Sequence, residues 1–146
     1  MEIQSYLVFL SELCQVLDSL TRLEQRKITA VRAGNLADLE QCMKQEQAAA
    51  LDLRGREQKR TRLLAQLGLE QVPLRDLPKH CPPEYRQQAS DITQQLIRSY
   101  QVLSSARTAA RTLMESNLHR IQQELDRRQQ VKEAPAPKAS QTDFRV

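Results

Sequence analysis

Residues 84–130 read EYRQQAS DITQQLIRSY QVLSSARTAA RTLMESNLHR IQQELDRRQQ and contain neither proline nor glycine. Apolar side chains recur through the segment at steps of three and four, which predicts one long amphipathic helix. At about 1.5 Å of rise per residue this helix is roughly 70 Å long, more than a chain of 146 residues can surround with its own core. We therefore expect its first half to pack inside the fold and its second half to project beyond it.

The composition favours long, thin helices over a thick globule. Only 3% of the residues are aromatic, 27% are charged, and the chain has three glycines and six prolines. Gln, Leu, Arg, Glu and Ala, which are strong helix formers, dominate the sequence. The sequence therefore predicts an all-α protein, and we expect no strands.

Two further helices are predicted before this segment, over about residues 3–32 and 36–67. Apolar residues recur in both at steps of three and four. Between them, Gly34 suits a left-handed C-cap and Asn35 suits an N-cap. A connection this short makes the two helices antiparallel neighbours, so we predict an antiparallel helical hairpin.

The predicted hairpin brings two acidic residues together. If the chain folds about Gly34, then Glu24 faces Glu46. Paired carboxylates can carry acid–base chemistry. We interpret this pair instead as glutamates at a helix edge that reach solvent or the lysines Lys27 and Lys44.

Residues 69–83 contain Pro73, Pro78, Pro82 and Pro83, and we predict a loop there that its leucines and valine hold across the hairpin end. The fold expected is an elongated three-helix, coiled-coil-like bundle in which the hairpin packs against the long helix of residues 84–130. We assign residues 1–130 to this helical domain. Residues 131–146, rich in proline and alanine, are expected to form a disordered tail.

Several classes of function find no support in the sequence. The cysteines Cys14, Cys42 and Cys81 are odd in number and lack CxxC spacing, so neither a disulfide framework nor a zinc site is predicted. His80 and Cys81 are interpreted as an exposed loop pair and not as a catalytic nucleophile. Without a phosphate-binding glycine loop, we expect no enzyme activity, no cofactor and no metal.

The charge pattern bears on partners and location. A net charge of +4 and a pI near 9.2 permit contact with nucleic acid, but the basic residues are interleaved with acidic ones, as on solvated helix faces. No apolar stretch is long enough to span a membrane, and the N-terminal apolar run is too short for a signal peptide. We expect a cytoplasmic protein with no nucleic-acid partner and no membrane insertion.

The projecting half of the long helix is the candidate functional site, because an apolar stripe without an intramolecular partner needs something to cover it. We predict that it binds a partner protein, and methionine suits a surface that adapts to one. Packing in a homodimer and folding back onto the hairpin are the two alternatives. The residues of the stripe are Leu113, Met114, Asn117, Leu118, Ile121 and Leu125.

Five stretches together carry a family signal: Leu20–Glu24, Arg32–Leu39, Gln45–Glu46, the charged run Arg54–Arg62, and Asn117–Leu118. With the layout of a hairpin, a long third helix and a tail, they resemble the FlgN family of flagellar export chaperones. The resemblance spans nearly the whole chain.

This resemblance implies a cytoplasmic chaperone that holds the C-terminal helical segments of the hook-associated proteins FlgK and FlgL. The chaperone would deliver them to the export gate of the flagellar type III apparatus, and the stripe on the third helix would contact the client. An aromatic residue of the tail would contact the gate. We map this role onto Phe144, although the chain has no tyrosine there. The alternative function is a coiled-coil structural or scaffold protein that homodimerises through the same stripe.

Overall fold

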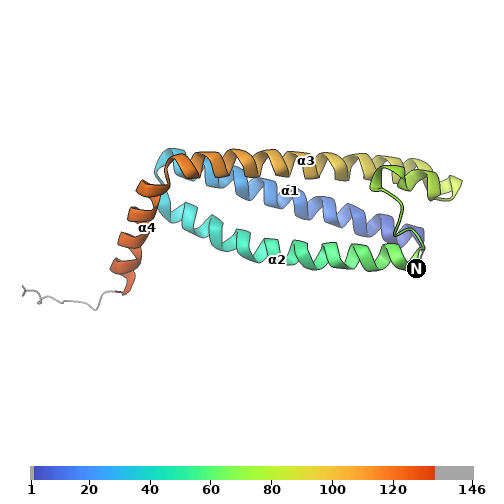
Figure 1. Cartoon of the computed structure of the whole chain (residues 1–146), viewed down its shortest axis with the longest axis horizontal. Helices are drawn as coiled ribbons and strands as arrows, with labels where there is room; N and C mark the ends of the chain where they lie inside the picture. Colours follow the sequence, from blue (N-terminus) through green and yellow to red (C-terminus); the bar gives the residue numbers. More distant parts are fainter. Residues whose placement is uncertain (1, 134–146) are drawn as a thin grey trace, which may run out of the picture.

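The computed structural model describes residues 2–133 as an elongated helical bundle, with no strand in that range. Its elements, in chain order, are α1 (Ile3–Ala33), α2 (Leu36–Gln66), the short 3-10 helices η1 (Leu74–His80) and η2 (Pro83–Tyr85), α3 (Arg86–Ser116) and α4 (Leu118–Glu133). In Figure 1, α1 lies between α2 and α3, and α4 turns away from the end of α3. The predicted all-α fold is confirmed.

The joint between α1 and α2 has the predicted geometry. Gly34 adopts a left-handed φ of 70°, and the N–H of Asn35 donates to the Ala30 carbonyl at 2.8 Å. The Asn35 side chain accepts a hydrogen bond from the Asp38 N–H at 3.1 Å and thus caps α2. The two helices are therefore antiparallel neighbours, as predicted.

The main core runs along α1, which contributes most of its buried side chains. These face α3 on one side and α2 on the other, whereas α2 and α3 contact each other little. Burying such side chains contributes roughly 1.5–3 kcal/mol each. The fully buried members on α1 include Tyr6, Leu7, Leu10, Leu13, Leu17 and Leu20, and α3 adds Ala89, Leu96 and Leu103.

The connection between α2 and α3 is more ordered than the predicted loop, because it contains η1 and η2. Leu77 of η1 is 2% exposed and packs into the main core. The interpretation of Cys81 as exposed is wrong: its side chain is buried and its Sγ donates to the Leu77 carbonyl at 3.4 Å. The turn of η1 carries Cys81 toward the core together with Leu77.

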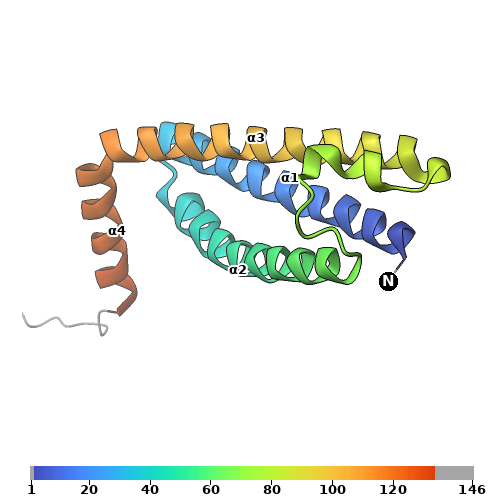
Figure 2. The same cartoon turned by 45° about the vertical axis from the view of Figure 1, so that its right-hand side comes forward.

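The prediction of one continuous helix over residues 84–130 is wrong. The helical chain is interrupted at Asn117, where φ is −118° and ψ is 9°, and α4 leaves the bundle axis at a steep angle (Figures 1 and 2). The Asn117 side-chain amide donates to the Leu113 carbonyl at 2.9 Å, which caps the end of α3. Consequently the expected projection is absent, and the chain folds back across the end of the hairpin.

Candidate functional site

A second apolar cluster, the end cluster, lies where the hairpin joint, the end of α3 and α4 meet. It is distinct from the main core. Both helices of the hairpin contribute to it, and so does α4, which lies beyond the hairpin joint in Figure 2. Its buried members are Ala30, Val31, Leu36, Leu39 and Ile121, and Met43, Leu113, Met114 and Leu125 pack half-buried against them.

The structure brings most of the predicted site residues to this cluster. Ile121, on the inner face of α4, is 2% exposed, and Leu125 packs beside it one turn later. Asn117 forms the break between α3 and α4. Leu118 is different, because 57% of it is exposed to solvent. Phe144 lies outside the described residues.

The residues on the hairpin side of the end cluster were missed by the sequence interpretation. Val31 and Leu36 flank the joint and are 3% and 7% exposed, and Leu39 is fully buried. The signal was present, because apolar residues on both sides of a short turn need a cover that neither helix provides. Ser116 and Asn117, which favour caps over helix interiors, also marked the place where α4 could turn.

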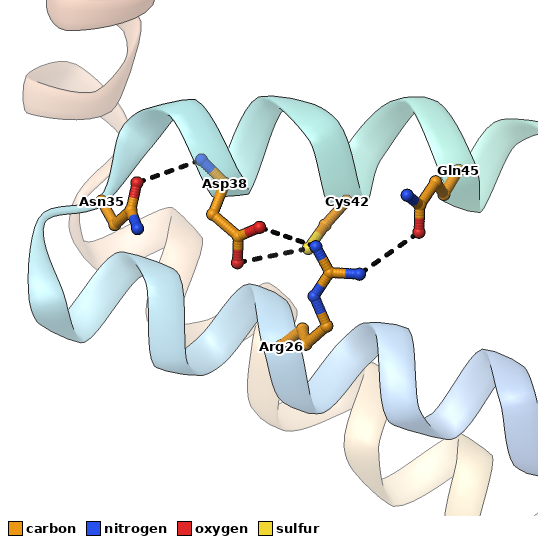
Figure 3. A network of polar contacts seen from close by, with 5 residues as sticks. All are labelled: Arg26, Asn35, Asp38, Cys42 and Gln45. Carbon is orange, nitrogen blue, oxygen red and sulfur yellow. Dashed lines mark hydrogen bonds and ion pairs between the residues drawn. The ribbon is translucent and has the colours of Figure 1, made fainter.

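A polar network on the outer side of the joint stabilises the hairpin end (Figure 3). Arg26 of α1 donates to Asp38 at 2.6 Å and to Gln45 at 3.3 Å, both on α2. The hydrogen bond to Asp38 raises the pKa of Arg26. Cys42 lies beside Asp38, with its Sγ 3.9 Å from the carboxylate, and burial raises the pKa of this thiol. The thiol is therefore held in its unreactive, protonated form.

The polar contacts of α4, like those of Arg26, are exposed. Lys132 donates to Glu40 of α2 at 2.7 Å, and this hydrogen bond lowers the pKa of the Glu40 carboxyl. The contacts of Arg127 with Glu124 and of Arg120 with Asn117 are local to α4 and its first turn. Because exposed ion pairs contribute little, α4 is held on the hairpin chiefly by Ile121 and Leu125.

A buried ionic cluster, formed by Glu24, Lys27 and Glu46, lies between the main core and the end cluster. Lys27 Nζ is 3.2 Å from Glu24 Oε1 and 2.9 Å from Glu46 Oε1. The predicted facing of Glu24 and Glu46 is therefore confirmed, with Lys27 bridging the pair. The interpretation that these glutamates reach Lys27 is confirmed, whereas a position at a helix edge open to solvent is wrong for Glu24, which is 1% exposed.

Ionisation within this cluster is shifted by burial and by its own members. Burial, with a further effect of the neighbouring Glu46, raises the pKa of Glu24 to about 7. For Glu46, burial raises the pKa, but the neighbouring Glu24 and the hydrogen bond from Lys27 outweigh this effect, so the net result is a lowered pKa. For Lys27, burial is outweighed by the two carboxylates, which raise the pKa.

The arrangement is suited to protein docking. Across residues 2–133, no three His, Cys, Asp or Glu side chains lie close enough to hold a metal ion. Nor does any helix in this range have the length and apolar character needed to cross a membrane. The end cluster is an apolar surface covered by the single short helix α4. An amphipathic helix of a partner protein can contact an apolar surface of this kind in the same way.

The family model described as FlgN protein matches residues 1–136 of the chain. No curated protein and no solved structure gives a significant match.

Proposed function

The chain belongs to the FlgN family, and from this membership of a flagellar export chaperone family we propose that it is a cytoplasmic chaperone for the hook-associated proteins FlgK and FlgL. It holds their C-terminal helical segments and delivers them to the flagellar type III export gate. The observation that supports this role is the end cluster, where one short helix covers an apolar surface on the hairpin.

The client-binding residues are those of the stripe: Leu113, Met114, Asn117, Leu118, Ile121 and Leu125. Leu118 is already exposed, whereas Ile121 becomes available only when α4 leaves the hairpin end. An amphipathic client helix then lies along the stripe, in the helix-in-groove mode of recognition. Asn117 is the point about which α4 moves, because it is the only residue between the two helices.

The stability of the closed arrangement sets the affinity for the client. Undocking α4 exposes Ile121 and Leu125, and full exposure of one such side chain costs roughly 1.5–3 kcal/mol. Because of that cost, only a fraction of the molecules have α4 undocked at any time. The apparent association constant for the client is the intrinsic constant multiplied by this fraction. A moderate affinity suits a chaperone that must release its client at the gate.

Leu118 provides the sharpest test of this site. We expect Leu118→Asp to leave helicity and thermal stability near those of the wild type, because the side chain is exposed, and to weaken binding of FlgK at least tenfold in titration calorimetry. Val102→Asp is the matched control, since Val102 is 46% exposed on α3 but lies outside the end cluster. Equal affinity of the Leu118 variant and the wild type would refute the placement of the site.

The tail is proposed to contact the export gate through Phe144. Deletion of residues 134–146 should leave FlgK binding unchanged and impair export, measured as loss of motility and of secreted FlgK. Phe144→Ala in the full chain should reproduce the defect. Normal motility of the deletion strain would contradict a gate contact in the tail.

A coiled-coil structural or scaffold protein that homodimerises through the same stripe is the second candidate. It is favoured by the exposure of Leu118, a large apolar member of the stripe that is 57% exposed. Sedimentation equilibrium distinguishes the candidates. A 1:1 complex with FlgK supports the chaperone, whereas a tight homodimer that excludes FlgK supports the scaffold.

A further inference from the structure

The buried ionic cluster contains more negative than positive charge. Glu24 and Lys27 come from α1 and Glu46 from α2, and the neighbouring charge on α3 is Arg107, whose side chain is exposed. One oxygen of Glu24, Oε2, is buried and has no hydrogen-bond partner among the described residues. A buried carboxylate oxygen without a partner is costly when it is charged.

One proton removes this imbalance. With both glutamates ionised, the two carboxylates and the single ammonium carry one net negative charge between α1 and α2. With a proton on the carboxyl pair, the cluster is neutral. The charge can then be held by Lys27 and Glu46, which are 2.9 Å apart, while Glu24 is neutral in its buried position.

We propose that Glu24, Lys27 and Glu46 form a proton-linked switch, which packs tightly with one proton bound and loosens the hairpin between α1 and α2 when that proton is lost. The switch lies one helical turn from Val31 on α1 and from Met43 on α2, both members of the end cluster. Loss of the proton therefore weakens the hairpin surface on which α4 docks. This regulation goes beyond the proposed function, because it requires no client.

The direction of the pH effect follows from the shifts of the three groups. Glu24 keeps its proton up to about pH 7 in the folded chain, above its ordinary pKa of 4.5, so the folded state binds more protons between these values. The contribution of Glu24 to the free energy of unfolding is therefore fully present below about pH 4.5, and it is lost as the pH rises toward 7. The lowered pKa of Glu46 affects the pH dependence of stability only under more acidic conditions. The raised pKa of Lys27 affects it only under strongly alkaline conditions.

Chemical denaturation of the full chain at a series of pH values from about 5 to 7.5 tests the switch. We expect the unfolding equilibrium constant of the wild type to rise with pH by up to about tenfold per pH unit in this window. Glu24→Gln, which imitates the protonated side chain, should flatten this dependence. Asp52→Asn is the matched control on α2, because Asp52 is exposed and outside the cluster, and it should keep the wild-type slope.

Equal slopes for the wild type and Glu24→Gln would overturn the proposal. A direct measurement covers the case in which the variant does not fold. In the wild type labelled with 13C at glutamate, the carboxyl signal of Glu24 should titrate with a midpoint near neutral pH. A midpoint below about 5 would overturn the proposal. Neither measurement includes FlgK, so failure of the switch is distinguishable from failure of the chaperone function.

Discussion

At the scale of single residues, the hairpin depends on the backbone of Gly34. Its φ of 70° lies in the left-handed region, which costs a residue with a Cβ roughly 1–2 kcal/mol. We expect Gly34→Ala to lower the free energy of unfolding by about 1 kcal/mol, measured by urea denaturation. Among the described residues, no neighbouring atom lies within 4 Å of the added Cβ, so the loss is one of backbone conformation and not of packing.

Gly55 is the matched control for this substitution, because it has equally open surroundings but lies inside α2. Alanine is favoured over glycine in a helix interior by roughly 0.8–1 kcal/mol. Gly55→Ala should therefore stabilise the chain while Gly34→Ala destabilises it. Changes of the same sign in both variants would contradict the role assigned to the left-handed turn.

A second residue-scale prediction concerns the contact between α2 and α3. The hydroxyl of Tyr100 donates to the Glu57 carboxylate at 2.5 Å, and burial, together with this neighbour, raises the pKa of the phenol. Tyr100→Phe leaves the half-buried carboxylate without that donor, so we expect a loss of about 1–3 kcal/mol in the free energy of unfolding. Tyr85→Phe, in η2 immediately before α3, is the control and should have little effect. Indistinguishable melting curves for the two variants would show that the bond contributes nothing to stability.

Residue-level features near the joint could be predicted from the sequence. The caps depend on local backbone chemistry, and the facing pairs depend only on how many residues separate each member from the turn at Gly34. Gly34 and Asn35 have the predicted caps, and Glu24 faces Glu46. The burial of Glu24 could not be predicted in this way. It depends on how closely a third helix approaches the pair, and helical periodicity alone does not give that distance.

At the scale of elements, the break at Asn117 shows how tertiary packing overrides a continuous helical pattern. Residues 84–130 have the apolar spacing of one helix and contain neither proline nor glycine, although Ser116 and Asn117 favour a helix end. The turn at Asn117 nevertheless allows Ile121 to cover Val31, Leu36 and Leu39. At the end of α3, the Asn117 side-chain amide donates a hydrogen bond to the Leu113 carbonyl, which the break leaves without its helical partner. The sequence thus identified the apolar stripe and left folding back onto the hairpin as one of its alternatives, and the structure shows that the hairpin end covers the stripe.

The attachment of α4 gives a prediction at this scale. Ile121→Ala removes the most buried side chain of α4, and such truncations cost roughly 2–5 kcal/mol. Because the end cluster is separate from the main core, we expect α4 to detach while the rest of the bundle keeps its stability. Hydrogen exchange should show faster exchange of the α4 amides by a factor of about ten or more, with the α1 amides unchanged.

Leu118→Ala serves as the control for this measurement, because Leu118 is on the same helix but is exposed. It should leave the exchange of α4 near that of the wild type. If Ile121→Ala instead accelerated exchange throughout α1 and α3, the end cluster would be part of one cooperative core, and α4 could not open independently.

At the scale of the whole molecule, the three long helices are unequally anchored. α1 has buried side chains along its whole length, whereas α2 has none between Cys42 and Leu63. In that interval α2 is held by half-buried residues such as Leu53 and by polar contacts such as those of Glu46 and Glu57. Polar contacts have a small net effect on stability compared with the burial of large apolar side chains.

We therefore predict that the middle of α2 opens before the rest of the bundle unfolds. In native-state hydrogen exchange, the amides of residues 44–62 should exchange at denaturant concentrations where those of residues 6–20 in α1 remain protected. The amides of residues 96–103 in α3, which face α1 in the main core, provide the internal control and should exchange with α1. Simultaneous exposure of all three segments would contradict this order, because it would mean that the polar contacts of α2 bind it as tightly as the apolar core binds α1 to α3.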